Sequence, residues 1–223
     1  MMDIEIEKRL DEGAKELGLV FTEEQRKRLL GYVDLLKRWN KTYNLTALKT
    51  DEQILVYHIL DSLAVVPSLR KCFSKEDSIT VLDVGSGGGL PGVVLAIMNP
   101  SWCITCIDAV EKKTSFVTLV AGMLGLKNLF AKHVRIEKYQ TSPVNLVISR
   151  AFASLADFAN WAGHHVATGG HLVAMKGHYL DDEVQELEKS SSWRIENYQP
   201  IQVPQLDAER CLIYLKLEGK EIG

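Results

Sequence analysis

The sequence predicts an α/β fold in which a doubly wound, Rossmann-like sheet follows a helical N-terminal extension. From about residue 78 onward, short apolar runs alternate with helical segments, a pattern typical of such sheets. The first run, Ile79 to Val84, is rich in β-branched residues, as expected of a strand buried on both faces. Residues 1–73 show helical periodicity instead. We therefore expect a helical extension over residues 1–73 and one sheet domain over residues 74–223.

Two capping boxes predict where the N-terminal helices begin. Thr22-Glu-Glu-Gln25 precedes apolar residues at helical spacing, which predicts a helix that runs to about Trp39. Thr50-Asp-Glu-Gln53 predicts the start of a second helix with an apolar stripe. The polar and aromatic segment 40–46 between these helices is expected to be a turn.

The sheet domain is predicted from strand-like runs separated by helical patterns and glycines. Strands are expected at 79–84, 102–107, 128–132, 145–149 and 171–175, followed by a partly antiparallel pair at 193–203 and 210–217. Helices are expected at 91–98, 111–124, 155–167 and 181–189. The third of these helices should stop before Gly169-Gly170, because glycine is frequent just after a helix end.

Composition narrows the class of protein. A chain of 223 residues with 46% hydrophobic residues can form one α/β domain with an appendage. It has no apolar run long enough to span a bilayer and no signal-peptide core, so we expect a cytoplasmic protein. The net charge of −3 argues against bulk nucleic-acid binding, although local basic patches remain possible. Cys72, Cys103, Cys106 and Cys211 lack zinc-type spacing, so we expect buried thiols and no metal site.

A glycine-rich loop after the first predicted strand is the clearest candidate binding site. Gly85, Gly87 and Gly89 remove side chains that would keep a ligand away from the backbone. A dinucleotide loop is the alternative, but Asp83 stands two residues before the first glycine and would repel a pyrophosphate. The spacing resembles motif I of class I S-adenosyl-L-methionine (AdoMet) methyltransferases, in which such an acid can attract the cofactor's ammonium group directly or through water.

Asp108 is the second acid of this candidate site. It stands 23 residues after Gly85, at the end of the second predicted strand. A carboxylate at that position can accept hydrogen bonds from both hydroxyls of a ribose. Because an acid there suits NAD as well as AdoMet, Asp108 indicates a nucleoside cofactor without choosing between the two.

Three further positions could carry chemistry. Ile136 and Glu137 follow the third predicted strand, where an adenine ring is held in this fold class. Arg150 closes the fourth strand and therefore lies at the edge where open α/β sheets bind ligands. His58 and Asp61 are three residues apart on a predicted helix and share one face. Structural roles, such as a salt bridge for Arg150 or mutual hydrogen bonding of the helix pair, remain alternatives.

Six segments along the chain carry a resemblance to known sequences. They are Trp39 to Thr46, His58 to Ser62, Asp83 to Gly92, Arg135 to Glu137, Ile148 to Ser154 and Met175 to Gly177. Leu90-Pro-Gly92 and the motif around Arg150 are more specific than the glycine loop. Together the segments resemble one family, the bacterial small-subunit ribosomal RNA guanine-N7 methyltransferases, also called the glucose-inhibited division protein B family, and the resemblance covers nearly the whole chain.

The resemblance implies a class I AdoMet-dependent methyltransferase with about seven strands. It implies AdoMet contacts at Gly85, Leu90, Ile136, Glu137 and Arg150. It also implies methylation at N7 of a guanosine in 16S ribosomal RNA, at RNA position 527 in the 530 loop. The expected partner is 16S ribosomal RNA or the small ribosomal subunit, and the protein is expected to act as a monomer.

Methyl transfer to guanine N7 needs no general base among the catalytic residues, because the N7 lone pair is free in the neutral base. Arg150 is a candidate for holding RNA or the base, and Asp61 or Glu137 is a candidate for stabilising the positive charge that moves to the purine. Further candidates for RNA contact are Tyr43, Asn44, His58 and Lys176. Of these, Tyr43 is the candidate for stacking on the base.

Two other functions remain open at this point. An NAD(P)-dependent oxidoreductase would share the doubly wound sheet, and Asp83 counts against it. A module that binds AdoMet or RNA without catalysis would share every motif described above.

Overall fold

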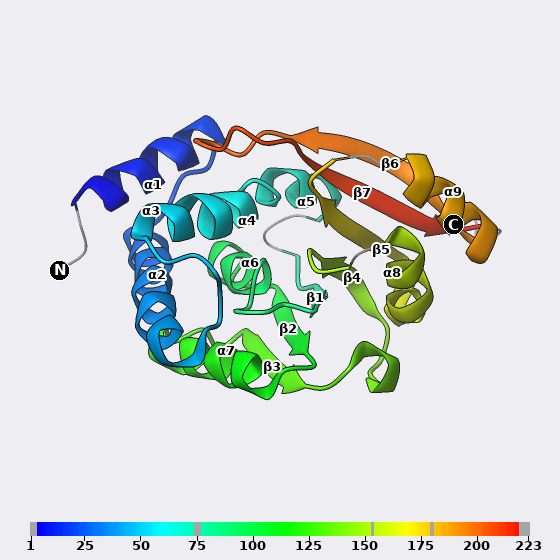
Figure 1. The fold of residues 1–223 in the computed structure, drawn as a ribbon, viewed down its shortest axis with the longest axis horizontal. Helices are drawn as coiled ribbons and strands as arrows, with labels where there is room; N and C mark the ends of the chain where they lie inside the picture. The colour runs from blue at the N-terminus through cyan, green and yellow to red at the C-terminus, as the bar shows by residue number, and fades with distance from the viewer. Residues whose placement is uncertain (1–3, 74–76, 153, 179–180, 219–223) are drawn as a thin grey trace.

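The fold is built around a seven-stranded sheet in the order β3-β2-β1-β4-β5-β7-β6 (Figure 1). It was obtained as a computed structural model, which describes residues 4–73, 77–152, 154–178 and 181–218. The strands are β1 (Thr80–Val84), β2 (Cys103–Asp108), β3 (Leu129–His133), β4 (Val144–Ser149), β5 (Val166–Lys176), β6 (Trp193–Ile201) and β7 (Arg210–Leu217).

The sheet is parallel except at one end. β1 pairs in parallel with β2 and β4, β2 with β3, and β4 with β5. β7 is antiparallel to both β5 and β6. The predicted sheet with a terminal antiparallel pair is therefore confirmed. In the β1–β2 register, Val84 lies opposite Ile107, so the carboxyl ends of these two strands meet at one edge.

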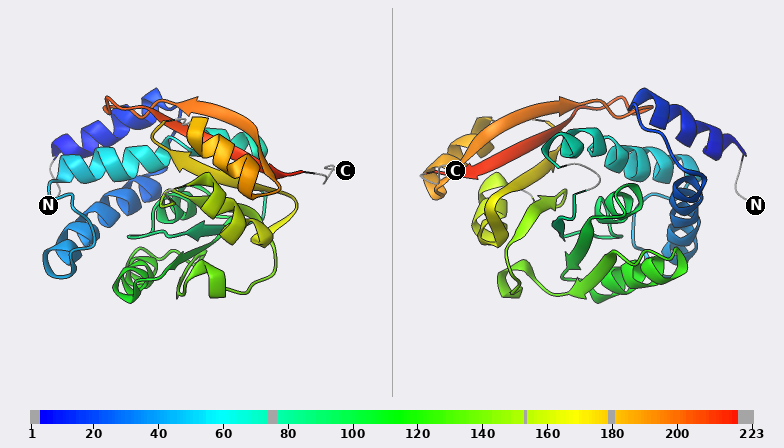
Figure 2. Two further views of the ribbon diagram at one scale, coloured as in Figure 1. Left: turned by 45° about the vertical axis from the view of Figure 1, so that its right-hand side comes forward. Right: turned by 180° about the vertical axis from the view of Figure 1, so that it is seen from behind.

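Helices cover both faces of the sheet. Figures 1 and 2 show α2, α6 and α7 on one face and α8 and α9 on the other. The α-helices are α1 (Ile4–Glu16), α2 (Glu23–Tyr43), α3 (Asp51–Ile54), α4 (Asp61–Leu63), α5 (Val66–Cys72), α6 (Gly92–Met98), α7 (Glu111–Met123), α8 (Leu155–Ala162) and α9 (Asp181–Ser190). A π-helix, η1 (Leu55–Leu60), joins α3 to α4, and two short 3₁₀ helices are η2 (Ile136–Lys138) and η3 (Gly163–His165).

The N-terminal helices share a hydrophobic core with the sheet. Leu29 of α2 and Ile59 of η1 are fully buried in the same cluster as Val94 of α6 and Leu146 of β4. This shared core fixes the extension against the edge of the sheet where the glycine loop lies. The division into parts at residue 73 stays a prediction.

The capping boxes are confirmed, but α2 is longer than predicted. It continues past Trp39 to Tyr43, and Asn44 ends it in the left-handed conformation, with φ 47°. The predicted turn over 40–46 is therefore wrong for its first four residues. Asn40 stabilises the irregular part by accepting a hydrogen bond from the Thr46 N–H (2.8 Å).

The boundary between α8 and β5 also differs from the prediction. The helix ends at Ala162, and β5 already begins at Val166 and continues through Gly169-Gly170. A side chain at Gly163 would meet the Trp193 ring, and one at Gly170 would come within 2.7 Å of the Asn145 carbonyl oxygen. Gly163 thus caps α8 where Trp193 packs against it, whereas Gly170 lies within β5 and allows close packing against β4 rather than ending a helix.

The cysteines correct a third expectation. Cys106 and Cys211 are buried, whereas Cys72 and Cys103 are exposed, and all four are free thiols. Within the described ranges, no cluster of His, Cys, Asp or Glu could hold a metal ion. In the same part of the chain, no helix has the length and apolar character that crossing a membrane requires.

Candidate functional site

The glycine loop connects β1 to α6 and has an unusual backbone. Gly85, Gly87 and Gly89 have φ values of +67°, +58° and +93°, which favour glycine strongly. The loop is tied down by Ser86, whose N–H donates to the Ile107 carbonyl (3.1 Å) and whose own carbonyl accepts from the Leu90 N–H (2.9 Å). A Cβ atom at Gly87 would meet nothing within 4 Å, so this side of the loop is open to a ligand.

Asp83 lies beneath the loop. Its side chain is fully buried, and its Oδ2 accepts a hydrogen bond from the Gly92 N–H at the start of α6 (2.8 Å). Burial raises the pKa of this carboxyl to about 7, against the lowering effect of the Gly92 hydrogen bond. Asp83 thus fixes the loop to α6, and its expected contact with a cofactor stays a prediction.

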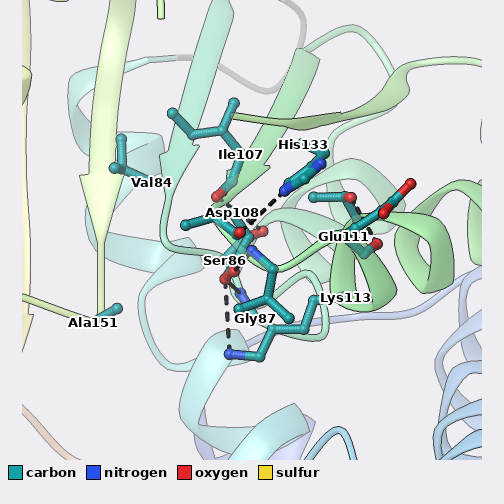
Figure 3. Close-up of polar contacts among 12 residues, drawn as sticks. Val84, Ser86, Gly87, Ile107, Asp108, Glu111, Lys113, His133 and Ala151 are labelled. Carbon is teal, nitrogen blue, oxygen red and sulfur yellow. Dashed lines mark hydrogen bonds and ion pairs between the residues drawn. The ribbon is translucent and has the colours of Figure 1, made fainter. Parts of the chain in front are cut away.

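Asp108 joins the end of β2 to the loop (Figure 3). Its Oδ2 accepts from the Gly87 N–H (2.9 Å), and its Oδ1 accepts from the Val110 N–H (2.9 Å). The Lys113 ammonium is 3.9 Å from the same Oδ2. The acid and the glycine loop that the sequence predicts to act together are therefore in direct contact.

Two cavities lie on either side of this contact. The β2 cavity, about 250 Å³, is lined among others by Gly85, Asp108, Ile136, Glu137 and Ala151. The loop cavity, about 240 Å³, is lined among others by Tyr32, Thr46, His58, Gly85, Gly87, Leu90, Arg150 and Ala151. Because Gly85 and Ala151 line both, the two cavities are neighbours along the carboxyl edge of the sheet.

A third cavity, the arginine cavity, is larger, at about 550 Å³. It is lined among others by Thr46, Tyr57, His58, Asp61, Arg150, Lys176 and Arg210. Thr46, His58 and Arg150 also line the loop cavity. The β2, loop and arginine cavities therefore form one series, with these three residues at the junction of the last two.

Asp61 is held between two arginines at the arginine cavity. The Arg150 Nη1 is 2.9 Å from Asp61 Oδ2, and the Arg210 Nε is 2.8 Å from Asp61 Oδ1. Asp61 is only 2% exposed, whereas the Arg150 and Arg210 side chains are 29% and 26% exposed, so the carboxylate is shielded from water and the guanidinium groups are shielded in part. Two guanidinium groups share one carboxylate here, which leaves one positive charge facing the cavity.

His58 is neutral near neutral pH. Burial lowers its pKa to about 4, and the positive charge of Arg150 acts in the same direction. Its Nδ1 lies 3.1 Å from the Tyr57 carbonyl oxygen, and its Nε2 lies 3.0 Å from the Thr46 hydroxyl. Because a carbonyl oxygen only accepts hydrogen bonds, we assign the proton to Nδ1, and Nε2 then accepts from Thr46.

The N-terminal extension contributes directly to the site. Tyr32 of α2 is fully buried, and its hydroxyl donates to the Gly88 carbonyl of the glycine loop (2.9 Å). Burial raises the pKa of this phenol, so it remains a donor. Sequence reasoning missed Tyr32, Thr46 and Arg210, because only the folded chain brings them to the loop and to Asp61.

The structure brings most of the predicted residues together but separates three. Glu137 lines the β2 cavity and not the arginine cavity, so it lies apart from Asp61 and is the weaker candidate for a charge near the base. Tyr43 stacks on Trp39 (4.8 Å between ring centroids), and Asn44 caps α2. Neither residue lines any of the three cavities.

Gly89 and Lys176 have packing or ion-pair roles in addition to those predicted. A side chain at Gly89 would meet Val93 and Val117, so this glycine allows α6 and α7 to approach the loop. Lys176 lines the arginine cavity, but its ammonium pairs with Glu183 at 2.8 Å.

The residues present fit the AdoMet that the resemblance implies. The β2 cavity combines the Asp108 carboxylate with the apolar Ile136, as a ribose and an adenine ring require. The loop cavity offers close approach to the backbone at Gly87. The residues shared by both cavities would allow one extended ligand to occupy the two together.

Sequence comparisons with known proteins find relatives that match nearly the whole chain. A sequence relative from Bordetella avium (strain 197N), named ribosomal RNA small subunit methyltransferase G, is 53% identical over 96% of this chain and 95% of its own length. A protein of the same name from Burkholderia vietnamiensis (strain G4 / LMG 22486) is 45% identical over 96% of this chain and 93% of its own length.

Solved structures show the same fold at low sequence identity. A SAM-dependent methyltransferase from Aquifex aeolicus superposes with a TM-score of 0.54 at 18% identity, covering 73% of this chain and 92% of its own. Aeropyrum pernix fibrillarin, in a structure with natively bound S-adenosylmethionine, gives a TM-score of 0.54 at 14% identity and covers 71% of this chain and 73% of its own. These likenesses identify the class I methyltransferase fold.

The family comparison covers most of the chain. The family model described as GidB, rRNA small subunit methyltransferase G, matches residues 25–213, a range that contains the glycine loop and all three cavities. The chain therefore belongs to the GidB family of rRNA small subunit methyltransferases.

Proposed function

We propose that this enzyme transfers the methyl group of AdoMet to N7 of a guanosine in small-subunit ribosomal RNA. The observation that carries the proposal is the series of cavities, in which Thr46, His58 and Arg150 line both the loop cavity and the arginine cavity. By the resemblance of its motifs, the guanosine is the one at RNA position 527 in the 530 loop. An oxidoreductase function is not supported, because the family is one of methyltransferases.

The β2 and loop cavities are the proposed cofactor site. Asp108 would accept hydrogen bonds from the ribose hydroxyls, and Ile136 would pack against the adenine ring. The positive-φ glycines let the backbone approach the amino-acid end closely. When bound, AdoMet supplies a methyl group activated on a sulfonium centre. The chain's main contribution is then alignment, which can be worth about 7–11 kcal/mol.

The arginine cavity is the proposed site of the target guanine. Its volume lies in the range of ligand pockets, and its polar groups converge from η1, α4, β5, β7 and Arg150, which directly follows β4. The unbalanced positive charge of Arg150 and Arg210 suits an RNA phosphate at the cavity mouth. Asp61 offsets one of these two positive charges, which limits the repulsion of a base that becomes cationic when N7 is methylated.

His58 is proposed to position the substrate rather than to move a proton. A neutral imidazole at the junction of the two cavities does not repel the positive charge that passes from sulfur to the purine. Its Nε2 is already occupied by the Thr46 hydroxyl. Since N7 needs no deprotonation, this arrangement is sufficient for transfer.

Residues of a single chain line all three cavities, and we propose that the enzyme acts as a monomer. Its RNA substrate places its proposed action in the cytoplasm, on 16S ribosomal RNA or the small ribosomal subunit.

Labelled AdoMet provides the test. The purified protein is incubated with small ribosomal subunits from cells that lack this enzyme, and in parallel with the naked RNA. The proposal predicts label in a single nucleoside, N7-methylguanosine. Label in a different nucleoside would overturn the assignment of N7, and no label in either substrate would leave a binding module without catalysis.

A further inference from the structure

Tyr57 is the most exposed aromatic side chain at the arginine cavity. It belongs to η1, lines the cavity and is 45% exposed. His58 is the other aromatic residue among the described residues of this lining, and its ring is held by Thr46. Tyr57 therefore places a partly exposed aromatic ring in the same lining as the cationic side chains of Arg150, Lys176 and Arg210.

The backbone beneath this ring is held firmly. The Tyr57 carbonyl oxygen accepts from the Arg150 Nη1 (3.2 Å) and lies 3.1 Å from the His58 Nδ1. Ile59 and Leu60 of the same π-helix are fully buried. The ring is therefore held at the cavity by a fixed backbone, which lowers the entropic cost of ordering this residue when a ligand binds. π-helical turns are frequent at functional sites.

The cavity has polar groups for the edge of an extruded base and an aromatic ring for its face. Asp61, Arg150 and Arg210 provide polar groups for the base edge and the phosphate, and Tyr57 provides an apolar face. Enzymes that act on a base inside RNA draw it out of its stack and hold it against aromatic side chains. Tyr43 cannot easily serve, since its ring is stacked on Trp39 and lies outside the cavity.

We propose that Tyr57 stacks on the target guanine in the arginine cavity and is a substrate-positioning residue of the methyl transfer. This inference rests on the proposed function. It adds the residue whose ring contacts the flat face of the guanine. Loss of one base–aromatic stack lowers affinity by a factor of about 5 to 150.

The test compares four variants in steady-state methyl transfer to small ribosomal subunits. Tyr57→Ala and Tyr57→Leu are expected to lower kcat/KM for the subunits by about 5- to 150-fold, because neither keeps an aromatic face. Tyr57→Phe should behave like the wild type. AdoMet affinity, measured by calorimetry, and the thermal unfolding midpoint should not change in any of these variants, since Tyr57 lines neither cofactor cavity.

Trp161→Ala is the matched control, because Trp161 of α8 is 44% exposed and lines none of the three cavities. It should retain wild-type kcat/KM. Wild-type kcat/KM in Tyr57→Ala, full rescue by leucine, or an equal loss in Trp161→Ala would overturn the proposal. Absence of transfer by the wild type would instead overturn the proposed function itself.

Discussion

Arg150 Nη1 lies 2.9 Å from Asp61 Oδ2, although the two residues are 89 positions apart in the sequence. Arg210, a further 60 residues along the chain, holds the other oxygen of the same carboxylate at 2.8 Å. One buried acid thus joins the N-terminal helical extension to the residue that follows β4 and to the first residue of β7. This contact fixes the wall of the cavity in which we propose the target base to lie.

Removing the central carboxylate should be costly for stability. Asp61→Ala leaves two arginines without their buried partner, so we expect the free energy of unfolding to fall by about 3–5 kcal/mol. Urea denaturation monitored by circular dichroism measures this loss. Lys37→Met removes the more exposed Lys37–Asp51 pair and should cost about 1 kcal/mol or less. Equal losses in the two variants would show that Asp61 is not a central support.

A side chain at Gly87 should prevent cofactor binding. The change Gly87→Val places a β-branched residue at φ +58° and fills the open side of the loop. We expect no AdoMet binding in calorimetry. The control is Gly122→Ala, where a Cβ also meets nothing within 4 Å but lies within α7, outside the three cavities. That variant should bind normally; wild-type affinity in Gly87→Val would exclude the loop as the cofactor site.

The carboxylate at the end of β2 should contribute to AdoMet affinity. Asp108→Asn keeps the size of the side chain but removes the charge that is expected to bind the ribose, and its amide can accept from only one of the Gly87 and Val110 N–H groups. Hydrogen bonds to charged groups contribute about 1.5–3 kcal/mol, so affinity should fall by a factor of about 10 to 150. Glu111→Gln, which removes an exposed carboxylate three residues later, should leave affinity unchanged. A similar loss in both variants would indicate general electrostatics instead.

Two buried groups should give opposite contributions to the pH dependence of stability. His58 has a pKa of about 4 in the folded protein against 6.5 ordinarily, so the unfolded chain binds more protons between these values. Its contribution to stability is complete above pH 6.5 and is lost as the pH falls. Asp83 has a pKa of about 7 against 3.8, so its contribution is complete below pH 3.8 and is lost as the pH rises through 7.

Single variants should separate these two contributions. The measured quantity is the free energy of unfolding at pH 7 minus that at pH 5. His58→Gln removes the histidine contribution, so this difference should become more negative than in the wild type. Asp83→Asn keeps an acceptor for the Gly92 N–H and should make the difference more positive. Shifts in the reverse directions would contradict the environments described for the two groups.

Local patterns predicted the parts of the site that depend on neighbours in sequence. The strand before Gly85, the capping boxes and the acid at Asp108 each follow from a short segment, and each is found where expected. The family motifs likewise identified Arg150 and His58 as residues near the site.

Long-range contacts explain the parts that were missed. Arg210 is 149 residues from Asp61, and nothing in its own segment indicates that they pair. The glycines at 169 and 170 resemble a helix end, but their place inside β5 depends on packing against β4. The sequence predicts Tyr43 in a turn, where its ring could stack on a base. In the structure α2 continues to Tyr43, and the ring stacks on Trp39, one helical turn earlier.

A crystal structure with S-adenosyl-L-homocysteine would show whether one ligand spans the two proposed cofactor cavities. We expect its adenine against Ile136 in the β2 cavity, its amino-acid end in the loop cavity at Gly87, and its sulfur facing the junction at His58 and Arg150. A ligand bound outside these cavities, or one whose sulfur faces away from the arginine cavity, would contradict this assignment.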